Sequence, residues 1–164
     1  MNRIHIGLQV TDIPASVGFY STLFGTPPSV EQPDYAKWML EDPRVNFSIT
    51  TRCGIGNGVH FGIQVEDSAG LEAVTERLAA AGLAVRETPD VTCCYARSDK
   101  SWAADPDGFP WETFLTHGLT TTYGSDSLTN QDIQALGESS GGCGCGAPES
   151  GEAKREQTAP TGCC

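Results

Sequence analysis

Two histidines and one glutamate are the residues best suited, by type and position, to hold a metal ion. His5 and His60 open two copies of one motif, His-Ile-Gly-Leu-Gln-Val-Thr-Asp and His-Phe-Gly-Ile-Gln-Val-Glu-Asp. Glu112 lies in a later predicted strand, in Trp-Glu-Thr-Phe. Two imidazoles and one carboxylate form the facial set that suits Fe(II) with open positions for O2 and substrate. The alternative is a pair of structural histidines and a solvated glutamate, but the repeat favours metal binding.

The number of ligands would distinguish between two kinds of metal chemistry. By two-fold symmetry, the first half of the chain could supply a fourth ligand from its last strand, within residues 45–51. That segment contains no Asp or Glu, and Asn46 or Ser48 stands nearest the expected position. Four ligands would favour Lewis-acid isomerisation, whereas three leave room for O2 activation. The missing carboxylate therefore favours O2 chemistry.

Two adjacent cysteines, Cys93 and Cys94, form the second group with chemical potential. Neighbouring α-carbons are about 3.8 Å apart, whereas disulfides usually join α-carbons about 4.4–6.8 Å apart. The pair is therefore suited to sharing one soft centre such as Cu(I), Zn(II), Cd(II) or trivalent arsenic. Tyr95 and Lys100 follow closely and could lower the thiol pKa values or shape a pocket. The alternatives are a chance adjacency or a strained redox pair.

The repeated motif predicts a strand that continues into a helix. Because successive side chains of a strand point to opposite faces, the histidine, glycine and glutamine of each copy share one face. The glycine would clear space beside the histidine. We expect this polar face, with Gln9 and Gln64, to line a cup, while the apolar face packs under a helix. A repeat of this kind indicates two equivalent modules.

We predict an α+β fold in one folded body, residues 1–117. Two β-α-β-β-β modules, residues 1–52 and 59–117, would form one curved mixed sheet with a cup inside and helices outside. Residues 118–164 are mostly Gly, Ser, Thr, Glu, Pro and Cys. This composition predicts a disordered tail. Its thiols could collect soft metal or simply be exposed.

Local signals divide the modules into elements. Asp12 is the predicted N-cap of the first helix, which Gly25 ends. In the second module, residues 84–87 and 100–104 are predicted strands. Residues 89–99 are predicted to be a loop that carries the cysteine pair.

Charge and hydropathy exclude several classes of partner. The 164 residues have a net charge of -11, which disfavours nucleic acid and anionic membranes as partners. No apolar run approaches the roughly 20 residues of a membrane span, and no signal segment opens the chain. We therefore expect a cytoplasmic protein, where thiols stay reduced. A homodimer, with the site completed within one chain or between two, is compatible with two paired modules.

The residues taken together resemble a known family. A doubled β-α-β-β-β plan with a strand-borne His, His and Glu is similar to the vicinal oxygen chelate superfamily. That superfamily includes glyoxalase I, bleomycin- and fosfomycin-resistance proteins and extradiol dioxygenases. The stretch from Cys93 to Trp102, with Asp105-Pro-Asp-Gly-Phe-Pro-Trp-Glu112 after it, resembles carbon–arsenic lyases (ArsI-type organoarsenical demethylases) and cadmium-induced CadI-type proteins.

The resemblance implies a specific reaction. His5, His60 and Glu112 would hold non-haem Fe(II), and Cys93 and Cys94 would hold a methyl- or aryl-As(III) substrate. O2 would be the co-substrate, the carbon–arsenic bond would break, and arsenite would leave. Two alternatives remain: a cysteine-based cadmium or arsenic binder without catalysis, and a glyoxalase- or fosfomycin-type metalloenzyme that does not need the cysteines.

Overall fold

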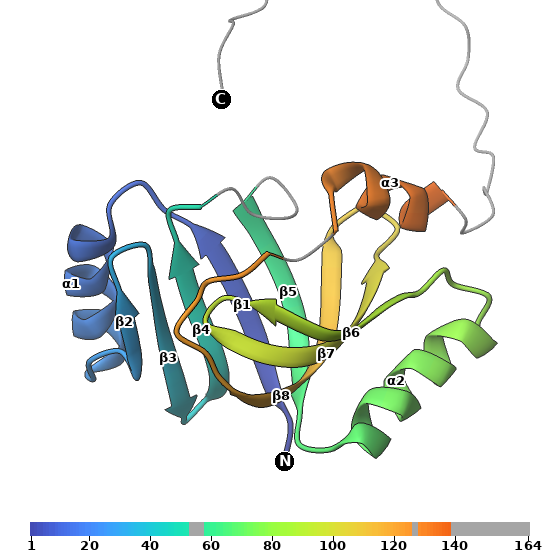
Figure 1. The fold of residues 1–164 in the computed structure, drawn as a ribbon, viewed down its shortest axis with the longest axis horizontal. Helices are drawn as coiled ribbons and strands as arrows, with labels where there is room; N and C mark the ends of the chain where they lie inside the picture. The colour runs from blue at the N-terminus through green and yellow to red at the C-terminus, as the bar shows by residue number, and fades with distance from the viewer. Residues whose placement is uncertain (53–57, 126–127, 139–164) are drawn as a thin grey trace, which may run out of the picture.

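The computed structural model describes residues 1–52, 58–125 and 128–138. It contains one sheet of eight strands, in the order β2-β3-β4-β1-β5-β8-β7-β6. Figure 1 shows this sheet curled, with α1 and α2 on its outside and α3 at one end. Residues of both modules line a cavity, called the hollow below, on its concave side. The elements are β1 Arg3–Gln9, α1 Ile13–Phe24, β2 Val30–Gln32, β3 Tyr35–Glu41, β4 Arg44–Thr50, β5 Val59–Val65, α2 Ser68–Ala80, β6 Arg86–Cys93, β7 Ala96–Ala104, β8 Pro110–Leu119 and α3 Asn130–Glu138.

The sheet consists of two modules with the same internal pairing, which confirms the predicted α+β fold. In the first module β1 runs parallel to β4, and in the second β5 runs parallel to β8. The antiparallel pair β1–β5 joins the modules at the centre of the sheet. The first strands of both modules therefore lie side by side, and each can present its motif to the same hollow.

The alternation of side chains separates a core from the hollow. On β3, Ala36 and Trp38 are fully buried and pack with Phe47 and Ile49 of β4 under α1. The residues between them point to the other face of the sheet. There the strands carry mainly polar side chains, so the concave face is chemically distinct from the core.

The helix starts are capped as the sequence predicts. The Asp12 carboxylate accepts a hydrogen bond from the Ala15 amide at 2.8 Å, and Gly25 ends α1 in the left-handed conformation. Asp67 caps α2 in the same way through the Gly70 amide. These caps satisfy amides that have no partner within the helix.

The predicted loop at residues 89–99 is wrong, because this segment belongs to a hairpin. β6 runs from Arg86 to Cys93, and β7 begins only two residues later at Ala96. Asp90 has a positive φ of 51°, and the pairing register shifts near it. This irregularity interrupts the alternation of side chains, so the strand pattern was hidden.

Part of the predicted tail is structured. β8 continues to Leu119, and α3 follows at Asn130–Glu138. Leu128 and Ile133 are buried against Trp102 of β7, and the remainder of the tail, residues 139–164, lies outside the described residues. No helix within the described ranges is both long and apolar enough to span a membrane.

Candidate metal and thiol site

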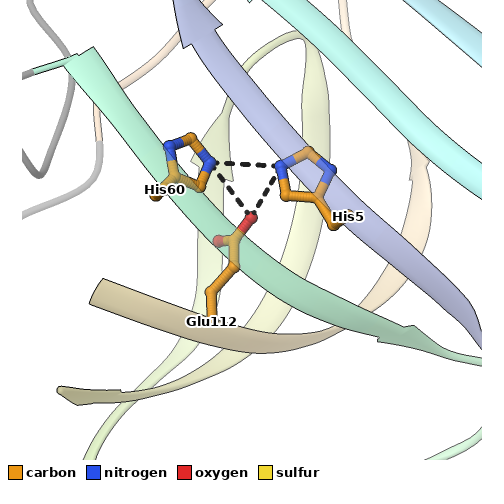
Figure 2. A group of neighbouring side chains, drawn as sticks. All are labelled: His5, His60 and Glu112. Carbon is orange, nitrogen blue, oxygen red and sulfur yellow. Dashed lines mark hydrogen bonds and ion pairs between the residues drawn. The ribbon is translucent and has the colours of Figure 1, made fainter. Parts of the chain in front are cut away.

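Three potential metal ligands from three strands meet in the hollow of one chain. His5 of β1, His60 of β5 and Glu112 of β8 point toward one another (Figure 2). The two Nε2 atoms are 3.1 Å apart, and Glu112 Oε1 lies 3.2 Å from His5 Nε2 and 3.5 Å from His60 Nε2. Ligands about 2.1 Å from one metal ion lie about 3.0–3.4 Å apart in octahedral or tetrahedral arrangements. The spacing therefore fits a shared cation.

The hydrogen bonding of His5 supports the same conclusion. Its Nδ1 lies 3.0 Å from the main-chain carbonyl oxygen of Asn46. A carbonyl oxygen only accepts, so Nδ1 carries the proton and Nε2 of the neutral ring offers a lone pair. That lone pair faces the Glu112 carboxylate. A carbonyl behind the ligating ring is the usual way in which proteins orient a metal-binding histidine.

Burial and neighbouring charges keep His5 and Glu112 in the protonation states that bind metal. Burial lowers the pKa of His5 to about 4, so the ring is neutral at pH 7. Burial alone would raise the pKa of Glu112. The Lys100 ammonium, 3.2 Å from Glu112 Oε2, and the two histidines outweigh burial, so this pKa lies below its usual range. Glu112 is therefore ionised, with Oε1 directed at the histidines and Oε2 at Lys100.

The glycines of the repeat make room for the ligands, as the sequence predicts. A Cβ on Gly7 would lie 2.2 Å from Cε1 of His60, which is its cross-strand partner. A Cβ on Gly62 would lie 2.2 Å from the Glu112 carbonyl oxygen. Neither position tolerates a side chain while the triad keeps its present geometry.

We expect Gly7→Ala to abolish metal binding while leaving the fold intact. The clash falls on the imidazole of His60, which can rotate away, so a ligand is lost before the sheet is disrupted. Fe(II) titration and thermal unfolding would be measured together. The matched control is Gly118→Ala, also in a strand, where an added Cβ meets nothing within 4 Å. Unchanged metal affinity in Gly7→Ala would contradict the assignment of His60.

Strand register identifies the residue that corresponds to Glu112 in the first module. Glu112 pairs with Gly62 between β8 and β5, and Ser48 pairs with Gly7 between β4 and β1. Gly7 and Gly62 are equivalent in the repeat, so Ser48 occupies the position of a possible fourth ligand. A serine hydroxyl is a weak ligand for a divalent ion. The triad therefore offers three strong ligand groups to a metal ion, which would leave coordination positions open.

The cysteine pair sits at the tip of the β6–β7 hairpin. Cys93 ends β6, and Cys94 and Tyr95 form a two-residue turn with φ values of 60° and 59°. Both are left-handed, as a type I′ turn requires, although Asn and Gly are the residues usually found there. A left-handed conformation costs roughly 1–2 kcal/mol for a residue with a side chain. This strained turn brings the two Sγ atoms to 2.8 Å from each other.

The two thiols differ in acidity. The hydrogen bond from Cys93 lowers the pKa of Cys94 to about 7. Burial acts in the opposite direction and raises this pKa, and the Lys100 ammonium offsets part of the effect of burial. The same hydrogen bond and burial raise the pKa of Cys93. The pair therefore holds one proton near neutral pH: Cys94 is the thiolate and Cys93 the donor. One nucleophile and one proton are ready for exchange with a soft electrophile.

We expect alkylation of the pair to show an inflection near pH 7. Above this pH Cys94 is a thiolate and reacts fast. Below it the rate falls about tenfold per pH unit, because only the thiolate is nucleophilic. Iodoacetamide labelling from pH 5.5 to 9, followed by peptide mass spectrometry, measures this. An inflection at about 8.5, the ordinary value for cysteine, would show that Cys93 and Lys100 do not stabilise the thiolate.

The triad and the thiols line the same cavity, which has a volume of about 470 Å³. Of the four further pocket residues predicted from sequence, Lys100 and Gln9 line it. Gln64 and Tyr95 are not among the described residues of its wall. Gln64 accepts a hydrogen bond from the Asn46 side chain at 3.0 Å, and the Tyr95 hydroxyl donates to Asp34 at 2.6 Å. Gln64 therefore bonds to a residue of the wall, and Tyr95 packs against two others, Tyr35 and Tyr123.

Tyr123 is a residue of the site that sequence reasoning missed. Its hydroxyl lies 3.7 Å from Cys94 Sγ and 3.2 Å from Thr50 Oγ1, and the Arg52 guanidinium stacks 4.3 Å from its ring centre. Gly124 makes this approach possible, because a Cβ there would lie 2.0 Å from the Thr92 carbonyl oxygen. The tyrosine stands in the segment predicted to be tail, so no local pattern indicated it. Its contacts join the hairpin to the first module.

Comparison with known proteins agrees with this fold. A family model described as Glyoxalase/Bleomycin resistance protein/Dioxygenase superfamily matches residues 3–113. The chain belongs to this superfamily. An extradiol ring-cleaving dioxygenase from B. fuscum has a TM-score of 0.50 at 17% identity, and the match covers 81% of this chain and 34% of that one. At that identity the likeness shows the fold alone.

Curated relatives are more similar in sequence. The trivalent organoarsenical cleaving enzyme of Bacillus sp. (strain MD1) is 48% identical over 119 residues, which are 71% of this chain and 74% of that protein. The trivalent organoarsenical cleaving enzyme of Thermomonospora curvata is 38% identical over 139 residues, covering 82% and 87%. The cadmium-induced protein CadI of Mycobacterium tuberculosis (strain ATCC 25618 / H37Rv) is 34% identical over 131 residues, covering 79% and 86%.

Proposed function

We propose that this protein cleaves the carbon–arsenic bond of trivalent organoarsenicals in a reaction that requires Fe(II) and O2 and releases arsenite. The observation that carries the proposal is one cavity lined by both a His-His-Glu triad and a vicinal thiol pair. A thiol pair alone would explain binding of a soft ion, and a triad alone would fit many metalloenzymes. Their combination favours chemistry on a thiophilic substrate next to a metal.

The thiol pair binds the arsenic. The Cys94 thiolate displaces one hydroxide from a substrate RAs(OH)2, and this hydroxide leaves as water with the proton of Cys93. The new Cys93 thiolate displaces the second hydroxide, which takes a proton from solvent. Two As–S bonds form, two As–O bonds break and two waters leave. The 2.8 Å separation of the sulfur atoms suits attachment to one atom.

The triad would hold the iron. Fe(II) bound by His5, His60 and Glu112 would supply O2 binding and the redox chemistry that an inert carbon–arsenic bond needs. Lys100 fixes the second carboxylate oxygen of Glu112, and Asn46 fixes the tautomer of His5. Ser48, in place of a fourth carboxylate, leaves room for ligands. With a methyl substituent, CH3As(OH)2 + O2 → HCHO + As(OH)3 balances without an added reductant.

The test is release of arsenite under controlled loading. The protein is reconstituted anaerobically with Fe(II), methylarsonous acid is added, air is admitted, and the arsenic species are separated. We expect arsenite and formaldehyde in equal amounts, with no arsenite when iron or O2 is omitted. Arsenical uptake without cleavage would support a thiol-based binder instead, which the cadmium-induced relatives also suggest. No uptake would point to a glyoxalase- or fosfomycin-type metalloenzyme.

A further inference from the structure

Three cationic side chains line the described wall of the cavity, and two of them have a carboxylate partner. Arg52 pairs with Asp34 at 2.5 Å, and Lys100 pairs with Glu112 at 3.2 Å. The third is Lys37. Among the described residues, no Asp or Glu forms an ion pair with it. Lys37 is therefore a cation of the cavity whose charge no carboxylate of the described chain balances.

Strand geometry explains why Lys37 faces the cavity. Its neighbours on β3, Ala36 and Trp38, are fully buried in the core under α1, so Lys37 points to the concave face. Its cross-strand partner on β4 is Ser48, next to the triad. The side chain is partly buried, and burial lowers the pKa of Lys37 while the Cys94 thiolate opposes this effect. The Cys94 thiolate is thus an anion that interacts electrostatically with the Lys37 ammonium.

Binding of the proposed substrate would remove that anion. When both sulfur atoms bond to RAs, they become neutral thioether-like ligands, and the negative charge of Cys94 is consumed. Lys37 is then left partly buried without a counter-ion, which is unfavourable. A substrate that brings its own anion would restore the balance. The cavity of about 470 Å³ lies within the range of about 300–1,000 Å³ typical of small-molecule sites, so a substituent larger than methyl has space.

We propose that Lys37 forms a subsite for an acidic group on the organic substituent of the arsenical, so that the preferred substrates carry a carboxylate or a similar anion. The inference rests on the proposed function, since it takes arsenic as the atom that the thiols bind. It adds a specificity-determining residue on β3, in the opposite module from the thiol pair. Lys100 cannot take this role, because Glu112 occupies its ammonium.

The test compares binding of carboxylate and carboxamide probes of equal size. The 3- and 4-carboxyphenylarsonous acids and their carboxamide analogues are titrated by anaerobic calorimetry at pH 7.5 into the metal-free full chain. Its four tail cysteines are replaced by serine, so that only Cys93 and Cys94 offer a thiol pair. A hydrogen bond to a charged group contributes about 1.5–3 kcal/mol, so we expect at least one acid to bind about tenfold or more tightly than its amide. Equal affinity of acid and amide for both isomers would overturn the subsite.

Variants of Lys37 assign the preference. Lys37→Met should bind acid and amide equally. It should bind methylarsonous acid at least as tightly as the native chain, because no ammonium is left without a counter-ion when the thiols bond to arsenic. Lys37→Arg should keep most of the preference, because it keeps the charge. A preference that survives in Lys37→Met would overturn the assignment to this residue. The result is independent of cleavage: a charge preference without arsenite release would contradict the proposed reaction only, and cleavage without the preference would contradict the subsite only.

Discussion

Replacing Glu112 by glutamine is expected to weaken Fe(II) binding by on the order of 100-fold or more, since even residues behind metal ligands contribute about 10–100-fold. The amide keeps the shape of the side chain but offers a neutral, weaker ligand atom to the point where His5 and His60 converge. Arsenite release should fall below detection, whereas arsenical binding by the thiols should remain. The measurements are Fe(II) affinity by anaerobic titration and arsenite release under saturating iron.

Loss of stability has to be separated from loss of the ligand. Glu112→Gln also leaves the buried ammonium of Lys100 without its carboxylate, and breaking a buried ion pair costs about 3–5 kcal/mol. The double variant Glu112→Gln with Lys100→Met removes both charges. It should recover most of the thermal stability but none of the metal affinity. Glu66→Gln, at an exposed glutamate, is the control for the substitution itself. Strong iron binding in the double variant would contradict the triad.

The two histidines of the triad could be predicted because the motif that carries them occurs twice in the sequence. His5 and His60 share a motif, and strand alternation then places both histidines and both glycines on one face. The prediction was weaker for Ser48, because Asn46 lies on the same face two residues away. A shift of two residues preserves the face of every side chain, so alternation alone could not choose between them. Only the pairing of β4 with β1 decides the register.

The hairpin and α3 were hidden for different reasons. Cys94 and Tyr95 form a turn that normally carries Asn and Gly, so no residue type indicated it. α3 did have a signal: Thr129 and Asp132 exchange hydrogen bonds between side chain and main chain at its start, which is the pattern of a capping box. The surrounding Gly-, Ser- and Thr-rich composition outweighed this signal. The packing of Ile133 against the sheet then stabilises a helix that composition disfavours.

Cys94→Ser is expected to abolish tight binding of the arsenical substrate. One remaining thiol cannot hold arsenic at two points, and loss of a second tethered contact typically reduces affinity by about 10²–10⁴-fold. Removing Cys94 also removes the thiolate. The variant lacks the hydrogen bond to Cys94 that raises the pKa of Cys93, but burial still raises this pKa, so Cys93 does not replace Cys94 as the thiolate. Arsenite release should therefore fall with arsenical affinity, while Fe(II) affinity stays unchanged.

The measurement has to exclude other thiols of the chain. Calorimetric binding of methylarsonous acid and arsenite release are compared in a background in which the four tail cysteines are serine, namely Cys143, Cys145, Cys163 and Cys164. Cys53→Ser is the matched control and should leave both quantities unchanged. If the affinity of Cys94→Ser for the arsenical stays within about threefold of that of the chain with Cys94, the thiols that bind arsenic lie elsewhere in the chain. If iron affinity falls as well, the hairpin also shapes the metal centre, because Lys100 acts on both Cys94 and Glu112.

The two large predictions therefore separate substrate binding from the reaction at the metal. Glu112→Gln loses the metal and keeps the substrate, whereas Cys94→Ser loses the substrate and keeps the metal.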